Sequence, residues 1–216
     1  MPIDYEHARH TMIEQQVRPW EVLDPRVLAA LAAVRREDFV PPRYRKLAFT
    51  DFEIPLEHGE MMMKPVVEGR MLQALSIAPD EEVLEIGTGS GFVTRCLCEL
   101  ARSVTSIDLH ADFVQRAGAR LEGLGCVRLE VADALDYAPG RQFDAIAVTA
   151  AVTAIPQQFR DWLRPGGRLF VVRGQSPSQE ALLVTRLAEG GFSEESLFET
   201  DLTYLRGAEP KPQFTL

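Results

Sequence analysis

The sequence predicts an α/β fold with a seven-stranded, mostly parallel sheet, helices on both of its faces and a helical extension at the N-terminus. Two observations lead to this prediction. From Glu82 onward, short apolar runs alternate with helix-like segments, which is the pattern of βαβ units. Residues 83–92 read V-L-E-I-G-T-G-S-G-F, so a buried strand, a glycine turn and a helix start follow one another directly. These features indicate a Rossmann-like arrangement, and 216 residues suit one such unit with a short extension.

The N-terminal part, residues 1–78, is expected to form a helical extension and a loop at the active site. Asp24-Pro25 predicts a helix start, because an aspartate cap there precedes a proline at the first helical position. A helix before it must end ahead of Pro19. The expected elements are helices over Tyr5–Val17, from Asp24 onward and over Val66–Leu75, with irregular chain at residues 43–52 and a loop at 54–60.

The remaining residues, 79–216, are expected to form the ligand-binding domain, in one compact unit with the extension. Five predicted strands alternate with helix-like segments after the extension, which implies a mostly parallel sheet. Two more runs flank Glu189-Gly190-Gly191, which predicts an antiparallel hairpin at the end of the sheet. The predicted strands are Glu82–Ile86, Ser103–Asp108, Val127–Val131, Phe143–Thr149, Arg168–Val172, Glu180–Ala188 and Leu197–Leu205.

Charge and composition argue against several classes of function. The chain has 23 basic and 32 acidic residues, a net charge of −9, which disfavours binding to a nucleic-acid backbone. No uncharged apolar run approaches the ~20 residues of a membrane span, and the first residues lack the features of a signal peptide. Three cysteines without C-x-x-C spacing indicate neither a disulfide framework nor a zinc site. We therefore expect a cytoplasmic protein without a metal that binds neither nucleic acid nor membrane.

The glycine turn predicts a small-molecule site. Its glycines at 87, 89 and 91 place backbone N–H groups and a helix N-terminus around a ligand, which a Cβ would obstruct. A dinucleotide fingerprint requires G-x-G-x-x-G, but Phe92 occupies its third glycine position. The run E-I-G-T-G-S-G instead resembles motif I of the S-adenosylmethionine (SAM)-dependent methyltransferases, whose turn packs against the methionine part and the ribose. An NAD-dependent oxidoreductase, or a turn that only joins strand to helix, is the alternative.

Two aspartates follow neighbouring strands at the end of the sheet where ligands bind. Asp108 ends the second strand, about 20 residues after the glycine turn, where a carboxylate can accept hydrogen bonds from both ribose hydroxyls. Asp133 follows the third strand and has the position and type to bind the adenine amino group. Each could instead cap a helix or a turn. The predicted cofactor-binding residues are Glu85, Gly87, Thr88, Gly89, Ser90, Gly91, Asp108, Leu109, Asp133, Ala134 and Thr149.

The segment after the fourth strand narrows the class of methyltransferase. Residues 147–156 read A-V-T-A-A-V-T-A-I-P, without the Asn/Asp-Pro-Pro-aromatic motif of amino-group methyltransferases. V-T-A-A-x-x-x-I-P, followed by L-R-P-G-G-R-L at residues 163–169, resembles the protein-L-isoaspartate O-methyltransferase family. Phe39-Val40-Pro41, Asp51 and the I-P-L-x-H-G run at 54–59 match that family as well. The resemblance extends over nearly the whole chain, and it implies a monomer.

This resemblance implies transfer of a methyl group from SAM to the α-carboxylate of an isoaspartyl residue in a damaged protein, with S-adenosyl-L-homocysteine as product. A carboxylate is already ionised at pH 7 and the sulfonium is an activated leaving group, so no general base is required. Catalysis then depends on holding the oxygen, methyl carbon and sulfur in line, where orientation contributes up to ~7–11 kcal/mol. Val148 and Ala150, with Met61 and Met62, are the expected substrate-contacting residues.

The loop after His58 departs from the family. Family members carry Gln-Thr-Ile-Ser there, and their serine is the residue usually assigned to the active site, whereas this chain has Glu60 and then Met61-Met62-Met63. Met63 takes the serine's place, so two hydroxyl donors are replaced by thioethers. Each lost hydrogen bond to a charged substrate would cost ~1.5–3 kcal/mol, and Glu60 would repel a carboxylate. The methionines form either a re-shaped, more apolar acceptor pocket or a flexible packing segment. His58 either orients the backbone near the active site or is a hydrogen-bonded loop residue without a chemical role.

Three hypotheses for the function follow. The leading one is a carboxyl methyltransferase that acts on isoaspartyl-containing peptides or proteins. The second is a paralogue that methylates a different, small-molecule acceptor, which would turn over SAM with a cell extract but not with an isoaspartyl peptide. The third is a SAM-binding protein without transferase activity, which would bind SAM and methylate no carboxylate.

Overall fold

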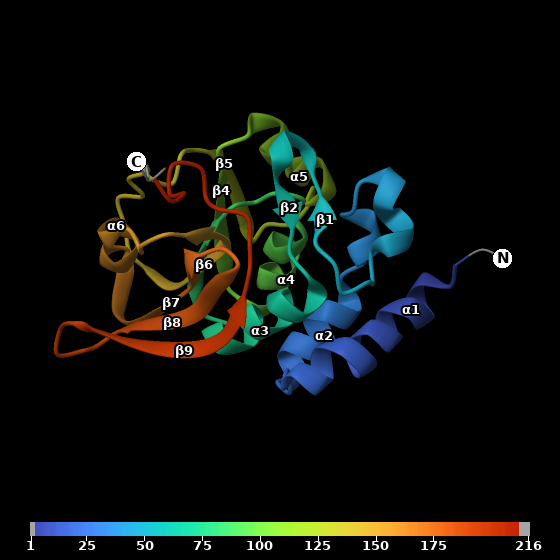
Figure 1. Ribbon diagram of the computed structural model, residues 1–216, viewed down its shortest axis with the longest axis horizontal. Coiled ribbons are helices and arrows are strands. Elements are labelled where there is room, and N and C mark those ends of the chain that lie inside the picture. Colours follow the sequence, from blue (N-terminus) through green and yellow to red (C-terminus); the bar gives the residue numbers. More distant parts are fainter. Residues whose placement is uncertain (1–2, 212–216) are drawn as a thin grey trace, which may run out of the picture.

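The computed structural model describes residues 3–211 and contains a seven-stranded sheet (Figure 1). Its strands, in order across the sheet, are β5 (Val127–Val131), β4 (Ser103–Asp108), β3 (Glu82–Ile86), β6 (Phe143–Val152), β7 (Leu163–Gln175), β8 (Ser178–Arg186) and β9 (Phe192–Thr200). The first five run parallel, and β8 and β9 are added antiparallel at one edge. The predicted α/β architecture is therefore confirmed.

The side chains of the central strands alternate between two apolar cores, because successive residues of a strand point to opposite faces of the sheet. On β3, Val83 belongs to one core, whereas Leu84 and Ile86 belong to the other. On β6, Ile146 and Val148 lie in the same core as Leu84. Because both faces of these strands are buried, their sequences are nearly continuous apolar runs.

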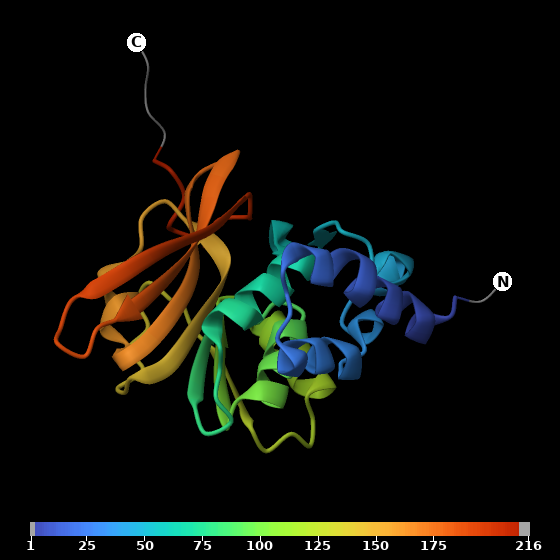
Figure 2. The same cartoon turned by 90° about the horizontal axis from the view of Figure 1, so that it is seen from below.

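Most of the helices cover one face of the sheet. The core on that face receives side chains from α1 (Tyr5–Met12), α2 (Pro25–Ala33), α3 (Pro65–Leu75), α4 (Phe92–Leu100) and α5 (Ala111–Arg120). The short α6 (Gln157–Asp161) packs into the core on the opposite face through Phe159. Helix α2 contacts both α3 and α4, which joins the N-terminal extension to the sheet (Figure 2). Across residues 3–211, no helix is both long enough and apolar enough to cross a membrane.

The helix starts follow the sequence more closely than the helix ends. Asp24 caps α2 as predicted, because its Oδ1 accepts a hydrogen bond of 2.8 Å from the backbone N–H of Arg26. Helix α1 ends at Met12, however, and the chain continues as a π-helical turn over Ile13–Val17 where α-helix was expected. The start of residues 43–52, which were expected to be irregular, belongs to a 3₁₀-helix over Pro42–Leu47.

The C-terminal hairpin is antiparallel as predicted, but its strands are shifted: β8 spans Ser178–Arg186 and not Glu180–Ala188, and β9 spans Phe192–Thr200 and not Leu197–Leu205. The acidic run at the start of β9 is typical of a loop, and this is the cause of the error. In the structure, β9 is an edge strand, and the Glu194 carboxylate lies 2.6 Å from Arg160 and 2.9 Å from Arg173. Charged side chains are common on exposed edge strands, where they oppose pairing with other sheets. Strands β6 and β7 also extend beyond the predicted limits, to Val152 and over Leu163–Gln175.

Candidate active site

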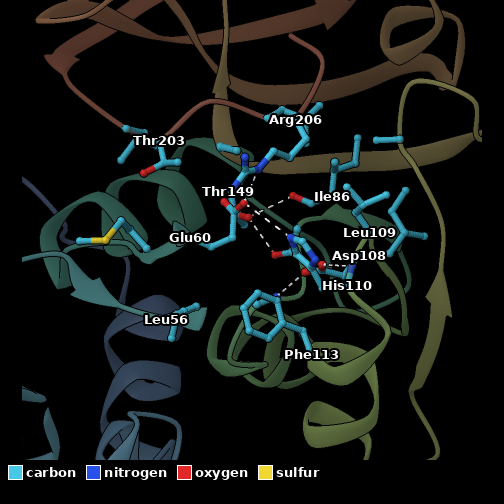
Figure 3. Close-up of a pocket in the computed structure, with 18 of the residues that line it drawn as sticks. Leu56, Glu60, Ile86, Asp108, Leu109, His110, Phe113, Thr149, Thr203 and Arg206 are labelled. Carbon is cyan, nitrogen blue, oxygen red and sulfur yellow. Dashed lines mark hydrogen bonds and ion pairs between the residues drawn. The ribbon is translucent and has the colours of Figure 1, made fainter. Parts of the chain in front are cut away.

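A cavity opens at the carboxyl ends of β3, β4 and β6, which is where parallel sheets of this kind bind ligands (Figure 3). Its atom-free volume, including the part open to solvent, is about 740 Å³. Ile86, Asp108 and Thr149 line it from the ends of the three strands. The two-stranded hairpin of β1 (Ile54–Pro55) and β2 (Met61–Met62) contributes a further wall. The geometry therefore brings two segments to one space: the glycine turn (residues 87–91) and the loop over residues 58–63, called the methionine loop below.

The glycine turn is locked against the end of β6. Gly87 has a φ of +96°, and a Cβ added to it would lie 2.3 Å from the Thr149 Oγ1. That hydroxyl donates to the carbonyl oxygens of Ile86 at 3.0 Å and Gly87 at 2.8 Å. Only glycine combines this backbone conformation with so close an approach. The turn is thus fixed by a contact across the sheet as well as by its own sequence.

Two carboxylates face the cavity from the ends of neighbouring strands. Asp108 is nearly buried, and its two oxygens accept backbone hydrogen bonds of 2.8 Å from Gly89 and from His110. Burial raises the pKa of Asp108, while the bonds from Gly89 and His110 oppose the shift. Asp133 accepts from the Leu135 backbone N–H at 2.9 Å and lines the same cavity. Each carboxylate has further lone pairs for a ligand, since an ionised carboxylate offers about four acceptor sites.

Glu85, a predicted cofactor-binding residue, does not line the cavity. It is fully buried on the opposite side of β3, where one oxygen accepts hydrogen bonds of 2.5 Å from Thr94 and from Ser106. Burial raises the pKa of Glu85 to about 8, and the two hydroxyls only partly offset that effect. Residue 85 points away from the cavity because strand residues alternate in direction. Glu85 therefore supports the glycine turn from behind by joining α4 to β4.

The methionine loop is held by a buried ion pair. Arg36 and Glu68 are both buried and pair through the Arg36 Nη1, while the Arg36 Nη2 donates to the Met63 carbonyl oxygen at 2.7 Å. Met61 and Met63 line the cavity. Met62 packs into the core and borders a smaller adjoining pocket instead. Alternation along β2 explains this separation, because neighbouring side chains point to opposite sides.

His58 connects the methionine loop to α5. Its ring stacks on that of His110 with a centroid distance of 4.1 Å, and its Nε2 lies 2.9 Å from the Asp112 Oδ1. His58, His110 and Asp112 offer ligand atoms within 4.8 Å of one another. An imidazole binds a metal in the plane of its ring, and the two stacked rings are parallel to within 7°. In this arrangement they do not converge on one ion, so the stack is better described as a packing contact that orients the loop.

Arg206 completes the rim of the cavity, and nothing in the sequence analysis identified it. It follows the last strand in a segment fixed to β6, since Ala151 accepts a hydrogen bond from Leu205 at 2.7 Å and donates one to Thr203 at 2.9 Å. The Arg206 Nε donates to the Glu60 Oε1 at 2.8 Å (Figure 3). Its Nη2 donates to the His58 carbonyl oxygen. Arg206 thus joins the C-terminal segment to the methionine loop.

The predicted site residues divide into those that line the cavity and those that do not. The first group is Met61, Met63, Gly87, Gly89, Asp108, Leu109, Asp133, Ala134, Thr149 and Ala150. In the second group, Thr88, Ser90 and Met62 border the adjoining pocket, Gly91 caps α4, Glu85 and Val148 lie within the sheet, and His58 stacks on His110. The cavity also contains residues that sequence reasoning missed, among them His110, Phe113, Leu202, Thr203, Leu205 and Arg206.

Comparison with known proteins gives one consistent family. The sequence profile described as protein-L-isoaspartate(D-aspartate) O-methyltransferase (PCMT) matches residues 7–205. A Gloeobacter violaceus protein-L-isoaspartate O-methyltransferase is 36% identical over 203 residues, covering 93% of this chain and 99% of that relative. A Koribacter versatilis protein of the same description is 37% identical over 195 residues, covering 88% and 86%.

The fold is similar to that of a Plasmodium falciparum protein assigned as a protein-L-isoaspartate O-methyltransferase and solved with S-adenosyl-L-homocysteine. The TM-score is 0.80 at 15% identity, and the match covers 95% of this chain and 99% of the other. The profile match and the two bacterial relatives each extend over most of the chain. The chain therefore belongs to the protein-L-isoaspartate(D-aspartate) O-methyltransferase family.

Proposed function

We propose that this protein is a SAM-dependent carboxyl O-methyltransferase that methylates the α-carboxylate of isoaspartyl residues in damaged proteins and releases S-adenosyl-L-homocysteine. One observation carries the proposal. A single cavity joins the aspartates at the ends of β4 and β5 to the methionine loop, with Gly87 and Thr149 between them. A cofactor bound along the strand ends and an acceptor bound at the loop would therefore meet in one space. The family membership supports the assignment of the strand ends to the cofactor and of the methionine loop to the acceptor.

The residues of the cavity fit SAM. Asp108 would accept hydrogen bonds from the ribose hydroxyls, and Asp133 would bind the adenine amino group. Gly87 and Gly89 would lie against the methionine part, because both line the cavity and a backbone without a Cβ lets a ligand approach closely. Leu109 and Ala134 add apolar surface on the adenine side. When bound, SAM supplies an activated methyl group on a positively charged sulfur.

The acceptor side of the cavity fits a nucleophile that needs positioning and no deprotonation. A carboxylate is ionised at neutral pH, and no basic side chain is needed to remove a proton. Met61, Met63 and Leu56 give this side an apolar wall that excludes water. A dry, oriented site is the condition under which alignment contributes up to ~7–11 kcal/mol to catalysis. The chain's own contribution is therefore to hold the acceptor oxygen in line with the methyl group.

The proposal also covers the organisation of the chain and its setting. Residues 1–78 would supply the extension and acceptor loop, and residues 79–216 the SAM-binding domain, the two working as one unit. The enzyme would act as a monomer in the cytoplasm, on peptides and proteins and not on nucleic acid. The net charge of −9 supports the last point, and the three free cysteines suit a reducing compartment.

The test is methyl transfer from labelled SAM to a peptide with one isoaspartyl residue, compared with the aspartyl form of the same peptide. We expect base-labile label on the isoaspartyl peptide alone, because methyl esters hydrolyse in base. A Met63→Ser variant, which restores the hydroxyl found in family members, is assayed beside the unmodified protein. Transfer by Met63→Ser but not by the unmodified protein would show that the natural acceptor is a different, small molecule. SAM binding by calorimetry without transfer by either protein would show a SAM-binding protein without this activity.

A further inference from the structure

The cavity as a whole carries an excess of acidic groups. Glu53, Glu60, Asp108 and Asp133 all line it, and Arg206 is the one lysine or arginine that does so among the described residues. A carboxylate that enters such a space is repelled by like charges at short range. The methionine loop adds no side-chain donor, because thioethers only accept weakly. A carboxylate acceptor therefore needs a cationic side chain, and Arg206 is the lysine or arginine that lines this cavity among the described residues.

Arg206 has the geometry for that role. Its Nε is used by Glu60 at 2.8 Å and its Nη2 by the His58 carbonyl oxygen, whereas its Nη1 donates to no residue within 3–211. The side chain is 51% exposed, so a ligand can reach the free end of the guanidinium. An arginine presents five donors in a rigid fork that matches a carboxylate. Glu60 and His58 together fix the orientation of this fork while leaving part of it open.

The segment that carries Arg206 is itself fixed at the reaction centre. Ala151 exchanges backbone hydrogen bonds with Thr203 and Leu205, directly beyond Thr149 and Ala150 at the end of β6. Arg206 therefore projects from an anchored backbone across the methionine loop. The aspartates predicted to hold ribose and adenine lie at the strand ends β4 and β5, whereas Arg206 contacts the loop of Glu60 and His58.

We propose that Arg206 binds the α-carboxylate of the isoaspartyl acceptor and selects for it, and that Glu60 holds the guanidinium in place while weakening this binding through its charge. The inference rests on the proposed function, because it assigns a subsite to that substrate. Arg206 would substitute for the loop hydroxyls that Met61 and Met63 cannot supply. The hydrogen bond from Arg206 to Glu60 is itself an arginine–carboxylate contact within the protein.

The experiment compares two blocked peptides that differ at one group, an isoaspartyl residue with a free α-carboxylate and the same residue with an α-carboxamide. Dissociation constants are measured by fluorescence anisotropy on protein saturated with S-adenosyl-L-homocysteine. The unmodified protein is expected to prefer the carboxylate peptide by about 10- to 150-fold, the range for hydrogen bonds to a charged group. In Arg206→Gln that preference should disappear. Arg206→Lys should keep part of it, since an ammonium provides charge without the fork.

Two controls make the result specific. Arg128→Gln removes an arginine that is 74% exposed on β5 and does not line the cavity, and it should leave both peptide affinities unchanged. Glu60→Gln keeps an oxygen acceptor for Arg206 while removing the charge, so carboxylate binding should tighten by roughly three- to tenfold. This second variant also tests the proposal if Arg206→Gln fails to fold.

The outcomes separate the inference from the proposed function. Retained carboxylate preference in Arg206→Gln, or weaker carboxylate binding in Glu60→Gln, would overturn the role of Arg206. Loss of SAM affinity in Arg206→Gln, with unchanged peptide preference, would overturn it too and assign the fork to the cofactor's own carboxylate. If the unmodified protein neither binds nor methylates the isoaspartyl peptide, the proposed function fails and the inference fails with it.

Discussion

Replacement of Gly87 by alanine tests how the cofactor turn is built. Gly87 has a φ of +96°, and a Cβ there would lie 2.3 Å from the Thr149 Oγ1, about 1 Å closer than ordinary van der Waals contact. The Thr149 hydroxyl would have to move away. It would then lose its hydrogen bonds to the Ile86 and Gly87 carbonyl oxygens. Gly87→Ala therefore combines two separable costs, backbone strain and the loss of a cross-strand contact.

The size of each cost follows from the geometry. A left-handed backbone conformation costs a residue with a Cβ ~1–2 kcal/mol. Thr149 has a single O–H, shared between the two carbonyl oxygens, so its loss adds ~0.5–1.5 kcal/mol. We expect Gly87→Ala to lower the free energy of unfolding by ~1.5–3.5 kcal/mol, and to weaken SAM binding because the turn lines the cavity.

A double-mutant cycle measured by urea unfolding separates the two costs. In a Thr149→Ala background the obstructing Oγ1 is absent, so Gly87→Ala should cost only the ~1–2 kcal/mol of backbone strain. Gly123→Ala is the matched control, because Gly123 has a φ of +84° and its Cβ would meet no atom within 4 Å. It should cost as much as Gly87→Ala does in the Thr149→Ala background. Equal costs for Gly87→Ala with and without Thr149 would refute the proposed steric coupling.

Three further predictions concern buried or partly buried charges. Because burial raises the pKa of Glu85 from its ordinary value of 4.5 to about 8, the stability from its neutral carboxyl is complete below about pH 4.5 and is lost as the pH rises to about 8. Glutamine does not titrate, so the free energy of unfolding of Glu85→Gln minus that of the unmodified protein should rise between pH 5 and 8, by at most ~1.4 kcal/mol per pH unit. A difference that does not change with pH would contradict this prediction. Arg36→Met leaves Glu68 without its buried partner and the Met63 carbonyl oxygen without its donor. The free energy of unfolding, measured by heat or urea, should fall by ~3–5 kcal/mol. A fall of less than ~1 kcal/mol would contradict the role of the pair. Asp108→Asn should weaken SAM binding by about 10- to 150-fold in calorimetry, and unchanged affinity would remove Asp108 from the ribose site.

The sheet was largely predictable because its signal is local. β3 and β4 are buried runs of five and six residues, and their predicted limits agree with the structure, as do those of the edge strand β5. Burial on both faces produces such runs. The start of β9 was not predictable in the same way, since its acidic residues face solvent and Glu194 pairs with arginines from α6 and β7. A charged edge strand has no apolar pattern, so sequence periodicity does not reveal it.

The site shows the same division between local and long-range signals. The glycine turn and the two aspartates could be located because topology brings the carboxyl ends of parallel strands together. The contact between Glu60 and Arg206 joins residues 146 positions apart, and no local pattern reports it. The direction of a strand side chain also decides a role, as Glu85 shows by pointing to the opposite face from Ile86, whereas Val148 is buried in the core. Motif membership alone therefore overestimated the set of cavity residues.

The most direct test of the account is the position of the transferred methyl group. The purified protein and SAM are incubated with an equimolar mixture of an isoaspartyl peptide, its aspartyl isomer and its isoaspartyl α-carboxamide, followed by fragmentation mass spectrometry. We predict one added methyl group, on the α-carboxylate of the isoaspartyl peptide, and none on the other two. Methylation of the aspartyl isomer or of another site, or no methylation of any peptide by protein that binds SAM, would contradict the assignment as an isoaspartyl carboxyl methyltransferase.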